Sequence, residues 1–227
     1  SGGDLVYSFV DYETQQQPVP GGSTTPAAVA NAANQMSSAE RRTSRKALLD
    51  TVSVMDYYDE TDAAPTASAF ARAFAAGKSV EVPQGASLTG LNSEVVIPNG
   101  KDLVTYGSIS GTYGGRFKME GSGEFFMRGG SLSNVFLLLT AGSPKVTGFR
   151  YSGRNNTAAL LIQGSGGAAF SNVVIKDPRI TGANYGILRQ GVGSTLDGCQ
   201  ITGGFFQDLY GDAIEFNVCP GDRNVHV

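Results

Sequence analysis

Metal ligands and disulfide partners are scarce in this sequence. Its 227 residues include no tryptophan, one histidine and two cysteines. One histidine and two cysteines cannot supply a four-ligand metal site alone, and two cysteines are too few for a disulfide scaffold. We therefore expect Cys199 and Cys219 to be buried thiols, joined only if the fold brings them within reach. We expect no metal and no cofactor.

Excess positive charge and long apolar segments are also missing. Lys plus Arg number 17 against 20 for Asp plus Glu, and no basic stripe interrupts the chain. The electrostatic attraction that drives nucleic-acid binding therefore has little to act through. No apolar run approaches the roughly 20 residues that span a bilayer, and the first residues lack the basic-then-apolar order of a signal peptide. These absences predict a soluble protein that folds in a cytosol, with no nucleic-acid and no membrane partner.

Glycine, in contrast, is abundant. The 31 glycines and the low charged fraction of 16% are typical of a turn-rich all-β chain. A helix is nevertheless predicted near the N-terminus, where Thr25 suits the N-cap, Pro26 suits the first helical position and an alanine-rich stretch runs to about Leu49. We expect residues 1–50 to form a linker and a helical neck. The neck either joins several chains or lies as a single helix against the next domain.

Residues 51–110 are predicted to begin a different domain. A short strand, Val52–Tyr57, precedes a helix that opens at Pro65, and a further strand follows at Ser79–Val82. This order resembles the entrance of the pectate-lyase-like β-helix superfamily, familiar from phage tailspikes. The residues that match its motifs are Val54, Asp56, Tyr57, Ala69, Phe70, Ala73, Phe74, Val80, Val82, Pro83 and Gly85. The resemblance implies that the helix caps the open end of a β-helix.

Two strand patterns repeat along residues 111–227. The first begins at residues 135, 158, 185 and 212 and reads VFLLL, AALLI, YGILR and DAIEF. The second begins at residues 146, 170, 196 and 222, with Gly148, Asn172, Gly198 and Asn224 in the same place, which predicts a stacked bend or bulge. Two strand families that keep step indicate a solenoid. With the resemblance, they predict an all-β fold that contains the first coils of a right-handed parallel β-helix.

The strands of the first pattern are apolar on both faces. Leu137 and Leu160 belong to one face, whereas the opposite face carries Phe136, Leu138, Leu161 and Leu188. A sheet that is apolar on both faces is buried on both. One face fills the interior of the coil, and a symmetric homotrimer would cover the other. Alternatively, a loop or the N-terminal segment covers it.

Charged residues interrupt these columns and lead into a distinctive C-terminal segment. Arg189 replaces an aliphatic residue on one face and Glu215 replaces a leucine on the other. Such a charge is costly unless it is paired or exposed, so each marks a polar site or an ion pair that ends the apolar contact. The segment Tyr210–Val227, which contains GDAIEFN, resembles a segment shared by phage polysaccharide-degrading spikes and by a bacterial β-helix protein associated with colanic acid.

Carboxylates in this segment suggest cleavage of a glycan. A glycosidase needs one carboxyl group as acid and another as base or nucleophile, and the candidate catalytic residues are Asp212, Glu215 and Asp222. On a regular strand Asp212 and Glu215 point to opposite faces, unless Asp212 lies in the turn. A lyase would instead need cations around a uronate carboxylate. The candidate substrate-binding residues are Arg189, Tyr210 and Arg223, with Lys176 and Arg179 as further cations and Phe205 among the aromatics suited to sugar stacking.

The function implied by these resemblances is that of a phage tailspike. We expect a virion protein that binds and depolymerises a capsular polysaccharide or exopolysaccharide, is attached through its N-terminus to other tail or spike proteins, and whose catalytic groove can lie beyond Val227. Hydrolase and lyase mechanisms both stay open. One alternative is a non-catalytic structural or adhesin β-helix. Another is a bacterial exopolysaccharide-pathway protein, which should lack a helical neck and usually begin with a signal peptide. The predicted linker and helix before Val52 argue against this alternative.

Overall fold

The computed structural model describes residues 51–76, 79–112, 114–154, 158–191, 193–217 and 219–227. One compact unit spans Leu48–Val227. The predicted linker and helical neck, residues 1–50, lie outside the described residues, and the predicted boundary at residue 110 stays a prediction. Within the described ranges no helix has the length and apolar character needed to cross a membrane.

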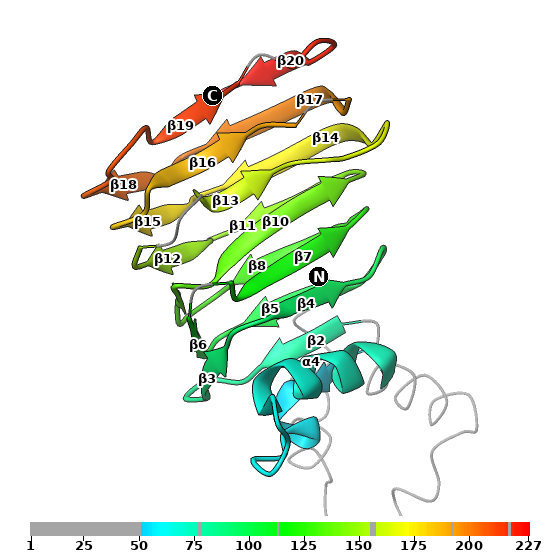
Figure 1. Cartoon of the computed structure of the whole chain (residues 1–227), viewed down its shortest axis with the longest axis vertical. Coiled ribbons are helices and arrows are strands. Elements are labelled where there is room, and N and C mark those ends of the chain that lie inside the picture. The colour runs from blue at the N-terminus through cyan, green and yellow to red at the C-terminus, as the bar shows by residue number, and fades with distance from the viewer. Residues whose placement is uncertain (1–50, 77–78, 113, 155–157, 192, 218) are drawn as a thin grey trace, which may run out of the picture. The chain divides into compact units, whose positions relative to one another are not determined.

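Three parallel sheets make up the unit, and each is built from strands that come from successive coils (Figure 1). The chain visits sheet A, sheet B and sheet C in turn and then climbs to the next coil. Six such coils run from β2–β4 to β17–β19, and β20 follows in sheet A. The prediction of an all-β parallel β-helix is therefore confirmed.

The strands are short, as expected for a coil with three corners. Sheet A contains β1 (Thr51–Ser53), β2 (Ser79–Val82), β5 (Asp102–Thr105), β8 (Gly123–Met127), β11 (Pro144–Thr147), β14 (Ala169–Lys176), β17 (Thr195–Thr202) and β20 (Arg223–His226). Sheet B contains β3 (Ser87–Leu91), β6 (Ser108–Gly111), β9 (Leu132–Ser133), β12 (Arg150–Ser152), β15 (Arg179–Thr181) and β18 (Phe205–Gln207). Sheet C contains β4 (Glu94–Ile97), β7 (Arg116–Glu120), β10 (Phe136–Ala141), β13 (Ala158–Ile162), β16 (Tyr185–Arg189) and β19 (Ile214–Phe216).

A helix closes the N-terminal end of the coil interior, as the resemblance implied (Figure 1). Helix α4 (Pro65–Ala76) starts at a proline, which suits the first helical turn, and buries Phe70 and Phe74, four residues apart on one face. The ring of Phe70 meets Phe117 edge to face at 5.0 Å between centroids. The Thr66 hydroxyl donates a hydrogen bond of 2.6 Å to the Thr89 carbonyl. The helix thereby continues the apolar core that the coils enclose.

The segment before that helix differs from the predicted strand. Only β1 is extended, and the 3-10 helix η1 (Val54–Tyr57) follows directly. The cause is local, because the Ser53 hydroxyl accepts a hydrogen bond from the Met55 backbone N–H and caps the turn.

The first repeat was predicted with the correct register. Leu137 pairs with Leu160, Leu160 with Ile187, and Ile187 with Ile214. These side chains form one interior column, because residues that are paired across parallel strands point to the same side of the sheet. On the outer face, Ala158, Leu161 and Leu188 are buried, with Phe136, Leu138 and Tyr185 packed against them. The apolar outer face is therefore real, and its coverage by a homotrimer stays a prediction.

The second repeat was predicted correctly in its later coils and wrongly in its first. Phe170 pairs with Leu196 as expected, but Val146 pairs with Ile175 and not with Phe170. Strand β14 has eight residues against four in β11, so only its second half finds β11 as a partner. Gly148 therefore does not belong to the bulge column, which consists of Asn172, Gly198 and Asn224, with φ of 50°, 86° and 57°.

Candidate functional site

Arg189 lies at the end of β16 and points into the coil. It pairs with Ile162 in the coil before and with Phe216 in the coil after, both interior positions, and its exposed fraction is 0%. Its guanidinium lies over the ring of Phe170 at 5.5 Å from the centroid. A charge placed so deeply requires a counter-charge and acceptors for its N–H groups.

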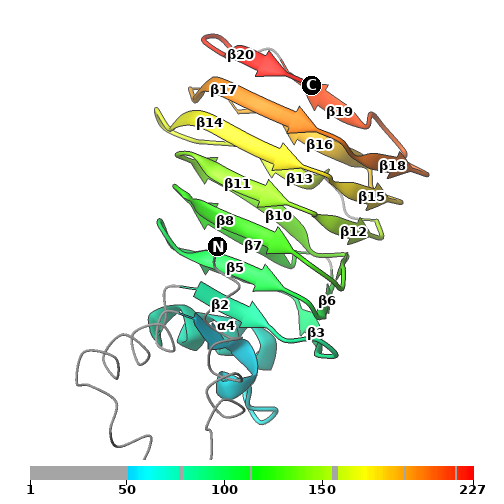
Figure 2. The same ribbon diagram turned by 180° about the vertical axis from the view of Figure 1, so that it is seen from behind.

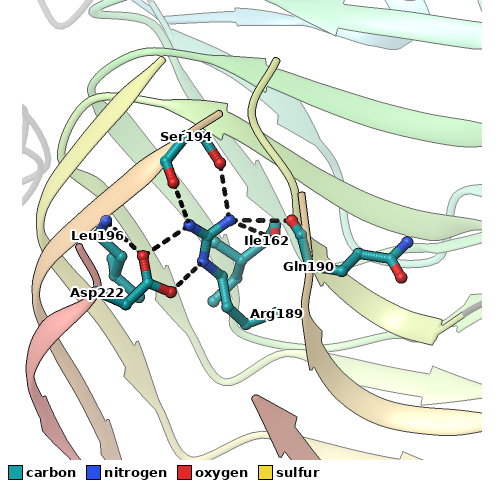
Figure 3. A network of polar contacts seen from close by, with 6 residues as sticks. All are labelled: Ile162, Arg189, Gln190, Ser194, Leu196 and Asp222. Carbon is teal, nitrogen blue, oxygen red and sulfur yellow. Dashed lines mark hydrogen bonds and ion pairs between the residues drawn. The ribbon is translucent and has the colours of Figure 1, made fainter. Parts of the chain in front are cut away.

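Asp222 supplies that counter-charge from the turn before β20 (Figure 3). Nε and Nη2 of Arg189 each donate to one carboxylate oxygen of Asp222 at 2.9 Å, which is a bidentate geometry. The remaining donors reach the Gln190 carbonyl at 2.9 Å, the Ser194 hydroxyl at 3.0 Å and the Ser194 carbonyl at 3.2 Å. Oδ1 of Asp222 also accepts from the Leu196 backbone N–H at 2.9 Å.

This network favours a structural role for two residues that were predicted to act on the substrate. All five guanidinium N–H donors of Arg189 have acceptors, so none is free for a ligand. The Asp222 side chain is 14% exposed and bonded on both oxygens. The pair ties the turn between β16 and β17 to the turn before β20, which matches the ion-pair alternative considered for Arg189.

The other predicted catalytic carboxylates do not join Asp222. Glu215 pairs with Leu188 and lies half-buried on the outer face of sheet C, whereas Asp222 is bonded to the inward-pointing Arg189. Asp212 is exposed in the loop before β19, where its backbone carbonyl accepts a hydrogen bond from the Gly186 N–H. The structure thus places the three carboxylates in three different surroundings. Among the described residues, no group of His, Cys, Asp and Glu side chains could hold a metal ion.

The last two predicted residues, Tyr210 and Arg223, both lie on the surface, and each already interacts with a neighbouring side chain. The Tyr210 ring is 65% exposed, and the guanidinium of Arg154 lies 3.9 Å from its centroid. Arg223 forms an ion pair of 2.7 Å with Asp197. The hydrogen bond from Arg223, with a second one from Asn224, lowers the pKa of the Asp197 carboxyl below its usual value.

A groove lies elsewhere, at the corner between sheets A and B. Three residues in successive coils, Gly148, Asp177 and Gly203, take the left-handed conformation there, with φ of 65°, 51° and 66°. Their hydrogen bonds run from coil to coil, from the Gly148 N–H to the Lys176 carbonyl and from the Asp177 N–H to the Thr202 carbonyl, both at 2.8 Å. These sharp bends turn each coil from sheet A to β12, β15 and β18 (Figure 2).

A hollow of about 370 Å³ lies at this corner. It is lined by Phe126, Thr147, Gly148, Arg150, Asp177, Arg179, Gly204 and Phe205. Arg150 pairs with Arg179, and Arg179 with Phe205, so the three side chains form one outward column. Phe205 is 51% exposed. The groove therefore presents two aromatic rings, two cations and one carboxylate, a combination able to hold a sugar by stacking, charge and hydrogen bonds.

Sequence reasoning named only part of this groove. Arg179 and Phe205 were considered, whereas Arg150, Asp177 and Phe126 were missed. A signal for them exists, because Gly-Phe-Arg at 148–150, Asp-Pro-Arg at 177–179 and Gly-Gly-Phe at 203–205 are versions of one corner. The incorrect alignment of Val146 with Phe170 hid that repeat.

Comparison with known proteins assigns the chain to a family. A family model described as "Colanic acid biosynthesis WcaM" matches residues 22–227. The chain belongs to this family. The colanic acid biosynthesis protein WcaM of Salmonella typhimurium (strain LT2) is 38% identical over 177 residues, which are 78% of this chain and 37% of that protein. The WcaM protein of Shigella flexneri is 35% identical over 159 residues, or 70% of this chain and 34% of that protein.

The chain therefore spans about a third of the length of the WcaM relatives that it matches. No solved structure gives a significant match. The relatives are bacterial proteins named for the biosynthesis of a polysaccharide.

This family assignment corrects the predicted identity. The expectation of a phage tailspike depolymerase located in the virion was wrong, because the family and its relatives are bacterial colanic acid biosynthesis proteins. The β-helix was inferred correctly, but a stack of parallel coils is an architecture that proteins of unrelated function share. The resemblance of Tyr210–Val227 included the colanic acid protein from the start, and the predicted linker and helix before Val52 were a poor reason to choose against it.

Proposed function

We propose that this chain takes part in the biosynthesis of colanic acid by binding the polysaccharide, or a growing segment of it, in the groove between sheets A and B. The observation that carries the proposal is the column Arg150, Arg179 and Phe205 beside Asp177, with the exposed ring of Phe205 able to stack on the apolar face of a sugar. Family membership supplies the polysaccharide as the candidate ligand.

Binding fits the described coils better than cleavage does. The most enclosed candidate carboxylate, Asp222, is saturated by Arg189 and Leu196, so it is not available as a general acid or base. A groove that crosses several coils suits an extended polymer, because each coil adds the same corner along the length of the ligand.

The direct test is the affinity of the purified chain for colanic acid, measured by calorimetry or by retardation in gels that contain the polysaccharide. We expect Phe205→Ala to weaken binding about tenfold, equivalent to about 1.4 kcal/mol. Tyr210→Ala is the comparison variant, because it also removes an exposed aromatic ring that was predicted to bind substrate, but Tyr210 lies outside the groove. Absence of binding by the unmodified chain, or equal loss in both variants, would refute the proposal.

The role in biosynthesis has its own test. In a strain that makes colanic acid with this protein, the Phe205→Ala substitution should lower the amount of exported polysaccharide, while Tyr210→Ala should leave it unchanged. Equal yields of exported polysaccharide from the two variants would show that binding in the groove is not needed for biosynthesis.

A further inference from the structure

Two arginines face each other in the groove, and among the described residues neither has an ion-pair partner. Arg150 and Arg179 are direct partners in the pairing of β12 with β15, and paired residues of neighbouring strands lie about 4.8 Å apart. Both are exposed, and among the described residues neither guanidinium forms an ion pair or a side-chain hydrogen bond. Like charges directly opposite each other destabilise a sheet. The fold itself therefore gains nothing from this pair.

The surroundings of the pair add to its positive potential. A third guanidinium, that of Arg128, lies 4.7 Å from the ring centroid of Phe126, another residue of the groove lining. The single carboxylate of the lining is Asp177. This local excess of cations occurs in a chain whose net charge is −3. An anionic ligand would be repelled by the chain as a whole and attracted to this corner.

Resting on the proposed binding function, we propose that Arg150 and Arg179 bind the carboxylate of an acidic sugar unit and that this contact determines specificity. Two guanidinium forks on adjacent strands can bracket one carboxylate, which relieves their mutual repulsion and forms charge-assisted hydrogen bonds. Phe205, next in the same column, stacks on the sugar ring that bears the acid. Asp177 accepts hydrogen bonds from sugar hydroxyls and would repel an acid that is bound in the reverse orientation.

The experiment compares two forms of one polymer. Affinity is measured for intact colanic acid and for colanic acid whose carboxyl groups have been chemically reduced to alcohols. We expect the unmodified chain to prefer the intact polymer at least tenfold. Arg150→Gln and Arg179→Gln should each abolish this preference while binding of the reduced polymer persists, and Arg179→Lys, which keeps the charge and loses the fork, should fall between.

Matched measurements separate the possible failures. Arg72→Gln removes an exposed cation at the capping helix, outside the groove, and should leave the preference intact. Melting curves with and without polymer check that each variant is folded, since only a folded variant is stabilised by its ligand.

Four results would overturn the inference. Equal binding of intact and reduced polymer by the unmodified chain would show that the groove does not recognise the carboxylate, without contradicting the proposed binding function. A preference that survives both Arg→Gln changes would place the acid elsewhere. Displacement of intact polymer by inorganic phosphate as effectively as by glucuronate would replace carboxylate recognition with general anion binding. Binding of neither polymer would refute the proposed function itself.

Discussion

The buried pair of Arg189 and Asp222 allows a sharp prediction about stability. Asp222→Ala removes two charge-assisted hydrogen bonds of 2.9 Å and leaves a guanidinium with an exposed fraction of 0% without a counter-charge. Breaking a buried pair from one side costs about 3–5 kcal/mol. At about 2–4 °C per kcal/mol for a domain of this size, the melting temperature should fall by about 6–20 °C.

Denaturant unfolding and calorimetry measure this loss, and hydrogen exchange locates it. The Leu196 N–H loses its acceptor, Oδ1 of Asp222, so its exchange should accelerate first. Asp212→Ala is the control, since it deletes an exposed carboxylate and should change stability by less than about 0.5 kcal/mol. In the double variant Arg189→Met with Asp222→Ala, much of the stability should return, because no unpaired charge stays in the coil. If Asp222→Ala is as stable as Asp212→Ala, the argument for a structural pair fails.

Two further predictions concern the space around a glycine and the burial of a thiol. Gly130→Ala should destabilise the fold more than Gly166→Ala. Both glycines have a positive φ near 60°, but a Cβ at Gly130 would collide with the Gly107 backbone, whereas a Cβ at Gly166 would meet nothing within 4 Å. Urea unfolding midpoints compare the two variants, and equal midpoints would contradict this argument. Burial raises the pKa of the Cys199 thiol to about 12. Iodoacetamide at pH 8 should therefore label the partly exposed Cys219 and spare Cys199 until the chain is unfolded. Labelling of Cys199 in the folded chain would contradict this prediction and show that its coil opens.

The register of the coils was predictable because a solenoid uses the same interior positions in each successive coil. Leu137, Leu160, Ile187 and Ile214 could be aligned from sequence alone, since each occupies the same interior position and packs on its counterpart in the next coil. The helix itself was predictable for a similar reason, because the four-residue spacing of Phe70 and Phe74 gives it one apolar face. The register and the existence of the helix depend on periodic apolar burial, which sequence patterns report directly, whereas the position of the helix at the end of the coils came from the family resemblance.

The polar contacts were harder to predict from the sequence. The two partners of each contact are far apart in the chain, and the corners between them vary in length, which obscures the alignment. Arg189 was recognised as an interruption of an apolar column, but nothing local indicated that Asp222, 33 residues later, would neutralise it. The groove was missed because β14 is twice as long as β11, which shifted the alignment of one coil and separated Arg150 from its true partner, Arg179. The family could not be derived from coil geometry at all.

The two arginine arrangements show how this fold separates stability from recognition. Inside the coil, the charge of Arg189 is compensated on every donor, so the pair contributes to cohesion between coils and offers nothing to a ligand. At the corner, Arg150 and Arg179 are exposed and have no ion-pair partner among the described residues, and each follows a left-handed bend of the backbone by two residues. Because corner side chains are not needed to fill the core, an unfavourable pair can persist there at small cost. Two arginines paired across strands without an ion-pair partner in the described part of the chain are therefore better explained by a ligand than by the fold.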